Sequence, residues 1–187
     1  MVQTPVQPLT LNAFLQLPET KPASEFINAQ IIQKPMPQGE HSTLQSELGN
    51  VINAVAKPVR MAYAFPELRC VFGGAAIAPD VSVFRWQRMP RTPSGRIANR
   101  FETYPDWAIE ILSPEPAQTQ LLAKLLHCIE HGTELGWLLD PGTDSILTIS
   151  SESRIKLYQD KEPLPVLSGL ELELSAVDIF SWLSLPE

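Results

Sequence analysis

The sequences APDVSVF at residues 78–84 and WAIEIL at residues 107–112 decide how this chain folds. Both segments are apolar and rich in residues that favour β-strands, and each contains one carboxylate, Asp80 or Glu110. Burying an unpaired polar group costs roughly 2–7 kcal/mol, and burying an ion costs far more. We therefore expect each acid to have a compensating partner, and a shared metal ion would serve both.

The segments around these two strands show helix and strand patterns in alternation. Between residues 40 and 57, apolar residues follow the i, i+4, i+7, i+8, i+11 spacing of an amphipathic helix that Pro58 ends. His41 projects within the apolar stripe of this helix, and Glu47 lies at its edge. A second helix is expected to start at Ser113-Pro114 and to carry Lys124 on its flank.

The remaining segments predict a sheet with short additions at the N-terminus. Residues 106–112 are apolar on both faces apart from the one glutamate, which is typical of a central strand covered by helices on each side. Further strands are expected at residues 59–72, 75–84, 136–140, 145–150, 155–159 and 170–174. A short helix after Thr10, a hairpin over residues 24–34 and a closing helix complete the chain. This order predicts an α/β fold with a central mixed sheet flanked by helices.

Composition limits the class of protein. The chain of 187 residues, with 44% hydrophobic residues, fits one domain over residues 1–187. No apolar run approaches the roughly 18 residues of a membrane span, and no signal-peptide pattern precedes the first helix, so we expect a cytoplasmic protein. The two cysteines, without CxxC spacing, indicate neither a disulfide framework nor a zinc site.

Positive charge is concentrated in one long loop, although the formal net charge of the chain is −7. Residues 85–105 contain prolines and a glycine, which predict a loop, and five arginines occur there without an acid between them: Arg85, Arg88, Arg91, Arg96 and Arg100. Arginine binds phosphate in a bidentate manner, so the loop and its Trp86 suit nucleic-acid contacts. A flexible solvated loop or a dimer interface would explain the same residues.

Asp80 and Glu110 have the composition of a hard-cation site. Mg²⁺ is typically held by one or two carboxylates, while water and substrate phosphate complete its coordination. A nearby lysine could stabilise charge on a phosphoryl transition state. In the alternative interpretation, Asp80 caps a strand after Pro79 and Glu110 pairs with an arginine such as Arg69.

An ordered set of motifs resembles a known family. The set comprises Pro79-Asp80-Val81, the sequence AIEILSP at residues 108–114, Lys124, Gly132, and the sequence WLLDP at residues 137–141. It is similar to the Uma-type family of proposed restriction endonucleases, within the PD-(D/E)XK nuclease superfamily. The resemblance covers nearly the whole chain. It implies a restriction-endonuclease-like fold with an N-terminal helix and a β-hairpin as additions.

The resemblance also implies roles for individual residues. Asp80 and Glu110 would be the metal-binding acids for Mg²⁺ or Mn²⁺, and Lys124 the catalytic lysine. The usual superfamily lysine position, two residues after the second acid, holds Leu112, so the lysine would come from the following helix. His41 matches a histidine near the start of the family's first long helix, where a core histidine is the alternative.

Glu47 stands where many nucleases of this fold place an additional acid, and an exposed helix glutamate is its alternative. The chain departs from the family pattern at residues 118–120, at Cys128 and at Gly136.

Three functions are compatible with these residues. The first is a Mg²⁺-dependent endonuclease that hydrolyses phosphodiester bonds, most readily in DNA, and acts as a homodimer because cutting two strands calls for a symmetric pair. The second is a catalytically weak or inactive nuclease-fold module for nucleic-acid binding or assembly, which the net charge and the departures favour. The third is a metal-dependent hydrolase of smaller phosphate esters.

Overall fold

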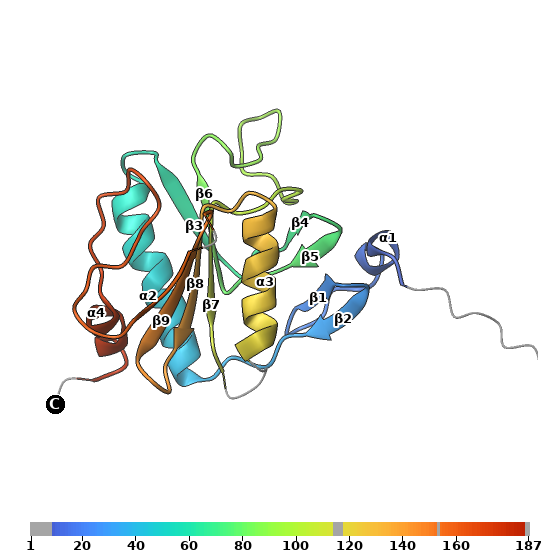
Figure 1. The fold of residues 1–187 in the computed structure, drawn as a ribbon. Helices are drawn as coiled ribbons and strands as arrows, with labels where there is room; N and C mark the ends of the chain where they lie inside the picture. The colour runs from blue at the N-terminus through green and yellow to red at the C-terminus, as the bar shows by residue number, and fades with distance from the viewer. Residues whose placement is uncertain (1–8, 114–117, 153, 186–187) are drawn as a thin grey trace, which may run out of the picture.

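The computed structural model describes residues 9–113, 118–152 and 154–185, which form two β-sheets and four helices (Figure 1). In chain order the elements are α1 (Leu11–Leu15), β1 (Ser24–Ile27), β2 (Gln30–Gln33), α2 (Gly39–Ala56), β3 (Ala62–Pro66), β4 (Cys70–Phe72), β5 (Ala75–Ile77), β6 (Val81–Arg85), β7 (Trp107–Ile111), α3 (Gln118–Glu130), β8 (Leu135–Asp140), β9 (Ser145–Ser150), β10 (Ile155–Tyr158) and α4 (Ala176–Ser181). The predicted mixed α/β class is confirmed.

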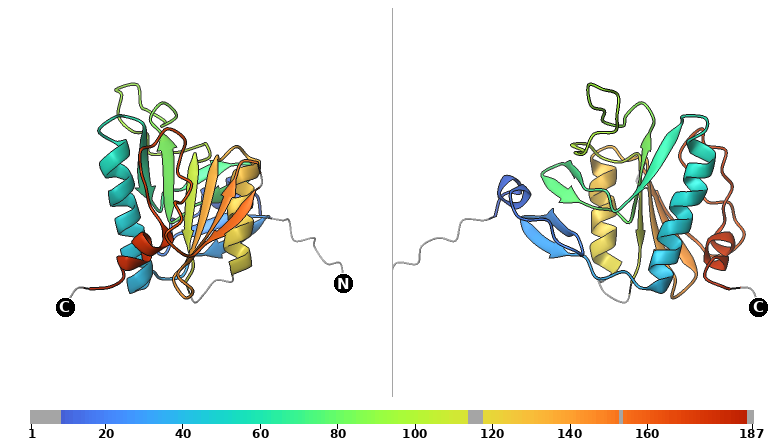
Figure 2. Two further views of the ribbon diagram at one scale, coloured as in Figure 1. Left: turned by 60° about the vertical axis from the view of Figure 1, so that its left-hand side comes forward. Right: turned by 180° about the vertical axis from the view of Figure 1, so that it is seen from behind.

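The larger sheet has six strands in the order β10-β9-β8-β7-β6-β3. Strands β7 and β8 are parallel, and the other neighbours in this sheet are antiparallel. Helices α2 and α4 cover one face and α3 covers the other, as Figure 2 shows. The predicted central strand is β7, and it is buried along its whole length because helices cover both of its faces.

Alternation along β7 divides its side chains between two cores. Trp107, Ile109 and Ile111 face the core beneath α2 and α4. Ala108 and Glu110 point the other way, toward α3, because successive side chains of a strand lie on opposite faces. The sheet therefore places Glu110 under the helix that carries Lys124.

The smaller sheet is antiparallel, in the order β2-β1-β5-β4, and contains the predicted N-terminal hairpin. Asn28 and Ala29 both have positive φ at its turn, the conformation of a two-residue hairpin turn. Thr10 caps α1 through its side chain, and Phe14 of α1 stacks on Phe26 of β1. Both predicted N-terminal additions are present.

Three predicted strands were wrong. The segment 59–72 splits into β3 and β4 of different sheets, and 75–84 splits likewise into β5 and β6. The chain changes sheets at Glu67, whose φ is 45°, and at 78–80, so Asp80 lies at a break before β6. Residues 170–174 form no strand; Leu170 and Leu174 bury their side chains in the core from irregular backbone.

The start of the second long helix was predicted at Ser113-Pro114, and Pro114 lies outside the described residues. Helix α3 is described from Gln118 onward, and Gly132 follows its end with a φ of 114°. Such a conformation is the usual C-terminal helix position for glycine. None of the helices in the described part of the chain combines the length and hydropathy that a bilayer-spanning segment requires.

Candidate functional site

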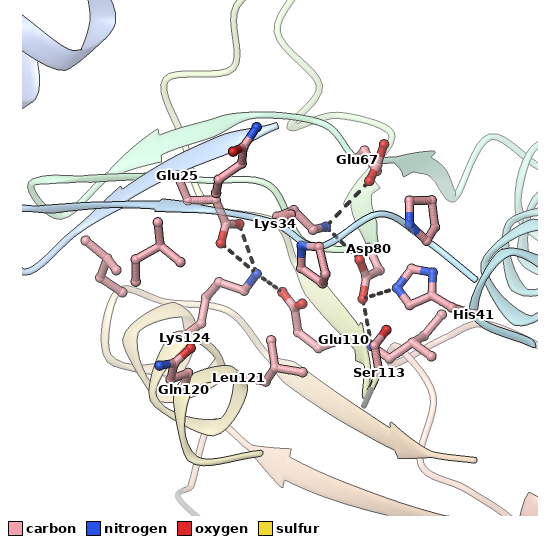
Figure 3. Close-up of a pocket in the computed structure, with 16 residues that line it drawn as sticks. Glu25, Lys34, His41, Glu67, Asp80, Glu110, Ser113, Gln120, Leu121 and Lys124 are labelled. Carbon is pink, nitrogen blue, oxygen red and sulfur yellow. Dashed lines mark hydrogen bonds and ion pairs between the residues drawn. The ribbon is translucent and has the colours of Figure 1, made fainter. Parts of the chain in front are cut away.

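A cavity between the two sheets gathers charged side chains from several elements (Figure 3). The structure brings Asp80, Glu110, Lys124 and His41 to this one cavity, as the sequence predicted from their spacing and from the family resemblance. Residues of the β1–β2 hairpin cover the cavity from the side of the smaller sheet.

The carboxylate of Asp80 is buried and held by three groups. Its Oδ1 atom accepts a hydrogen bond of 2.6 Å from the Lys34 ammonium, and its Oδ2 atom accepts one of 2.7 Å from the backbone N–H of Ile111. The Nε2 atom of His41 lies 3.2 Å from Oδ2. Gln45, one turn after His41, donates to the backbone carbonyl of Asp80 at 2.8 Å. Helix α2 thus fixes the acid, and the Ile111 contact places it beside Glu110.

The carboxylate of Glu110 is fully buried and has far fewer partners. The Nζ atom of Lys124 lies 2.9 Å from its Oε1 atom, yet neither Glu110 oxygen accepts a well-directed hydrogen bond within the described residues. The same ammonium lies 2.9 and 3.1 Å from the two oxygens of Glu25. Glu25 also accepts a 2.6 Å hydrogen bond from the N–H of Ala78. Lys124 is therefore fixed between two acids, one from each sheet.

These surroundings give Asp80 and Glu110 opposite pKa shifts. Burial alone would raise the pKa of Asp80, but its contact with His41 and the charge of Lys34 hold that pKa well below its ordinary value. Burial raises the pKa of Glu110 to about 8, and the charge of Lys124 only partly opposes this. Burial would lower the pKa of Lys124, but the neighbouring carboxylates raise it. Asp80 is thus stabilised by three neighbouring groups, whereas Glu110, among the described residues, has an ion pair with Lys124 alone.

The residues fit a metal ion in part. Among the described residues, no three His, Cys, Asp or Glu side chains form a ready ligand cluster, and lysine ammoniums lie against the acids. The unpartnered oxygens of Glu110 nevertheless suit a cation, and Asp80 lies beside it. Two carboxylates are sufficient protein ligands for Mg²⁺ when water and substrate supply the remaining oxygens.

The other predicted residues lie elsewhere. Glu47 is half-buried on α2 and is not among the residues that line the cavity. Arg69 does not pair with Glu110, as the alternative interpretation required; its side chain lies 3.7 Å from Glu19. The arginine loop leaves the far end of β6 (Figure 1), about 13 Å from the start of that strand at a rise of about 3.3 Å per residue.

Within that loop the arginines differ. Arg85 makes two hydrogen bonds of 2.7 Å to Glu134, and Arg88 donates to Asp106 at 2.6 Å. Arg91 lies over the ring of Trp86. The side chains of Arg96 and Arg100 are exposed. The first two arginines are therefore held in ion pairs within the chain, and the last three remain accessible from solvent.

Sequence reasoning missed three residues of the site: Glu25, Lys34 and Gln45. Glu25 lies on the first hairpin strand and Lys34 directly follows the second. From sequence alone, both are expected to be ordinary polar residues on the surface of a hairpin. Two signals could have found them. A glutamate stands before the apolar pair of β1 at a position that its strand buries, and Gln45 follows His41 by one helical turn.

The fold and the site together define a class. The chain is an α/β protein with a mixed six-strand sheet, and it carries a buried cluster of Asp80, which precedes β6, Glu110 of β7 and Lys124 of α3.

Comparison with known proteins gives the family. The chain belongs to the Uma2 family, because the family model, described as "Putative restriction endonuclease", matches residues 11–184. A crystal structure from Anabaena variabilis ATCC 29413, described as "a putative nuclease belonging to DUF820", is 51% identical to this chain. It covers 95% of this chain and 100% of its own, with a TM-score of 0.91. No curated protein matches the chain. The family that the motifs indicated is confirmed.

Proposed function

We propose that this protein is a metal-dependent endonuclease with a restriction-endonuclease-like fold, which hydrolyses phosphodiester bonds in DNA. The observation that carries the proposal is the convergence of Asp80, Glu110 and Lys124 in one buried cavity. Family membership and the similarity to a protein described as a nuclease support the same reaction class.

Each residue has a role that its contacts support. Asp80 and Glu110 would hold Mg²⁺ or Mn²⁺, and such an ion, when bound, supplies Lewis acidity and lowers the pKa of a water molecule. The ammonium of Lys124, held by Glu25, is available to stabilise negative charge that develops on a phosphoryl oxygen. His41 and Gln45 keep Asp80 at a fixed position relative to Glu110.

The phosphates of DNA are negatively charged, and the protein has a net charge of −7, so the two would repel each other overall. DNA binding therefore requires a local group of positively charged side chains. The exposed side chains of Arg91, Arg96 and Arg100, in the long loop that follows β6, provide it. A homodimer would place two cavities on one duplex, which a double-strand cut requires.

Cleavage of plasmid DNA in Mg²⁺ by the purified protein tests the proposal. We expect Asp80→Ala and Glu110→Ala to abolish cleavage, while Glu171→Ala, which removes an exposed acid outside the cavity, leaves it unchanged. Circular dichroism should show that all three variants are folded. Undiminished cleavage by folded Asp80→Ala or Glu110→Ala protein would refute the assignment.

One observation favours a second candidate, a nuclease-fold module that binds nucleic acid or assembles without catalysis. Lysine ammoniums already lie against the acids of the cavity, and a permanent arrangement of this kind would exclude a metal ion. Isothermal titration with MnCl₂ separates the two candidates: binding that Asp80→Ala removes supports the nuclease. DNA binding or self-association without any Mn²⁺ binding supports the module.

A further inference from the structure

A second lysine, Lys34, contacts the site from the smaller sheet. It follows the last residue of β2, and its side chain is only 9% exposed. Its ammonium donates to Asp80 Oδ1 at 2.6 Å and to the backbone carbonyl of Ala78 at 2.9 Å. Because Asp80 Oδ2 is already engaged by Ile111 and His41, Oδ1 is the oxygen that contacts the long side chain of Lys34.

The surroundings of Lys34 offer its ammonium a second position. The carboxylate of Glu67, which also lines the cavity, lies 3.7 Å from the same Nζ atom and is 43% exposed (Figure 3). A lysine side chain has four rotatable bonds, so a short swing moves the charge from Asp80 toward Glu67. The hydrogen bond from the N–H of Lys34 to Ala23 keeps the hairpin backbone in place during such a movement.

Within the residues that the structure describes, Lys124 has no comparable alternative partner. Its ammonium is enclosed between Glu25 and Glu110, both buried, and its own side chain is 5% exposed. The two lysines therefore differ: one is fixed, and the other has an inner and an outer acid within reach.

We propose that Lys34 is a built-in counter-ion of Asp80, which competes with a divalent cation for Oδ1 and moves toward Glu67 when the cation binds. The inference rests on the proposed function, because it assumes that Asp80 and Glu110 hold a cation. It adds a regulation of that site: occupancy by metal depends on the position of one hairpin lysine.

Calorimetric titration of the full-length protein with MnCl₂ tests this competition without measuring cleavage. Removing the competing charge with Lys34→Gln should tighten Mn²⁺ binding roughly tenfold, since two like charges in one low-dielectric cavity repel strongly. Lys34→Arg keeps the charge and should bind Mn²⁺ like the wild type. Lys161→Gln removes an exposed lysine outside the cavity, with the same change in net charge, and should also leave the affinity unchanged.

Two further variants locate the effect. Asp80→Ala combined with Lys34→Gln should lose the tight binding, which assigns the measured ion to this cavity. Glu67→Gln removes the outer partner of Lys34 and should weaken Mn²⁺ binding in an otherwise native chain. Thermal unfolding monitored by circular dichroism confirms that each variant is folded.

Unchanged or weaker Mn²⁺ binding by folded Lys34→Gln protein would overturn the competition. Absence of Mn²⁺ binding by wild type and variant alike would overturn it together with the proposed metal dependence. Tighter binding by Lys34→Gln in a protein that never cleaves DNA would support the competition while refuting the nuclease. The two failures are thus distinguishable.

Discussion

The two ends of strands β6 and β7 carry charged side chains in very different ways. At the end near Asp80, five buried or nearly buried charged groups share one cavity, and within the described part of the chain neither Glu110 oxygen accepts a well-directed hydrogen bond. At the other end, each buried or half-buried acid meets an arginine: Asp106 binds Arg88, and Glu134 binds Arg85. Both ends bury carboxylates, but among the residues that the structure describes only the cavity end leaves a carboxylate without a well-directed hydrogen bond.

The difference teaches how a functional charge cluster is distinguished from structural ion pairs. In a structural ion pair, the guanidinium N–H donors and the carboxylate oxygens satisfy one another, so no further ligand is required. The cavity end is open, because neither Glu110 oxygen accepts a well-directed hydrogen bond within the described residues, and burial raises the pKa of Glu110 although Lys124 lies beside it. Variants at each end should therefore separate into those that change activity and those that change stability.

The largest expected effect comes from Lys124→Met at the cavity end. Loss of the ammonium should reduce cleavage about 100-fold or more, as for removal of other transition-state charge stabilisers. It also leaves two buried carboxylates without their shared cation, so the free energy of unfolding should fall by about 3–5 kcal/mol. Single-turnover cleavage and urea unfolding measure the two effects.

Glu110→Gln is the matched variant, because it removes the charge with little change of shape. Cleavage should fall as steeply, but stability should not fall, since a buried charge disappears and Lys124 keeps Glu25. If Lys124→Met were as stable as Glu110→Gln, the ammonium would not be the cation that compensates these acids.

Whether a cavity residue could be predicted from the sequence depends on how far apart in the chain it and its partner lie. Asp80, Glu110 and Lys124 were found because each lies in a periodic segment or a motif that local reading detects. Glu25 and Lys34 were missed because their partners lie 99 and 46 residues away, at Lys124 and Asp80. A single strand or turn can indicate that a charged side chain is buried, but it does not indicate which distant residue becomes its partner.

The same reason explains the errors in the fold. Central strand β7, helix α2 and the described part of helix α3 were predicted correctly, since hydrophobic periodicity reports which faces are buried. Residues 59–84 were predicted as two long strands, because the pattern says that a segment is extended but not which sheet it joins. The change of sheet occurs at Glu67 and at residues 78–80, where backbone conformation and long-range pairing decide.

A smaller effect, on stability alone, is expected from Asp106→Ala at the loop end. This buried carboxylate accepts the backbone N–H of Arg85 at 2.7 Å and the Arg88 guanidinium at 2.6 Å. Its loss should lower the free energy of unfolding by about 2 kcal/mol, because both donors lose their partner. Cleavage per folded molecule should be unchanged. A loss of activity beyond the loss of folded protein would mean that the loop end takes part in the reaction.

Next in size is the contribution of Arg96, an exposed arginine of the loop, to DNA affinity. If this side chain contacts phosphate, Arg96→Gln should reduce the slope of log K against log salt by about 0.9 and weaken binding equally across DNA sequences. Fluorescence anisotropy at several salt concentrations measures the slope, with Lys161→Gln as the charge-matched control. An unchanged slope would remove Arg96 from the DNA-contacting surface.

The smallest expected effect is a pH dependence of stability from the Glu134–Arg85 pair. Its hydrogen bonds with Arg85 hold the pKa of Glu134 below the ordinary value of 4.5. A depressed folded-state pKa stabilises the protein above that ordinary value, and this stabilisation is lost as pH falls through the folded-state pKa. Because the side chain is 38% exposed, solvent screening keeps the contribution to about 0.2–1 kcal/mol. Glu134→Gln should therefore melt slightly below wild type at pH 7, and the difference should shrink as the pH falls below 4.5. A difference that stays constant with pH would mean that packing, rather than charge, makes the pair stabilising.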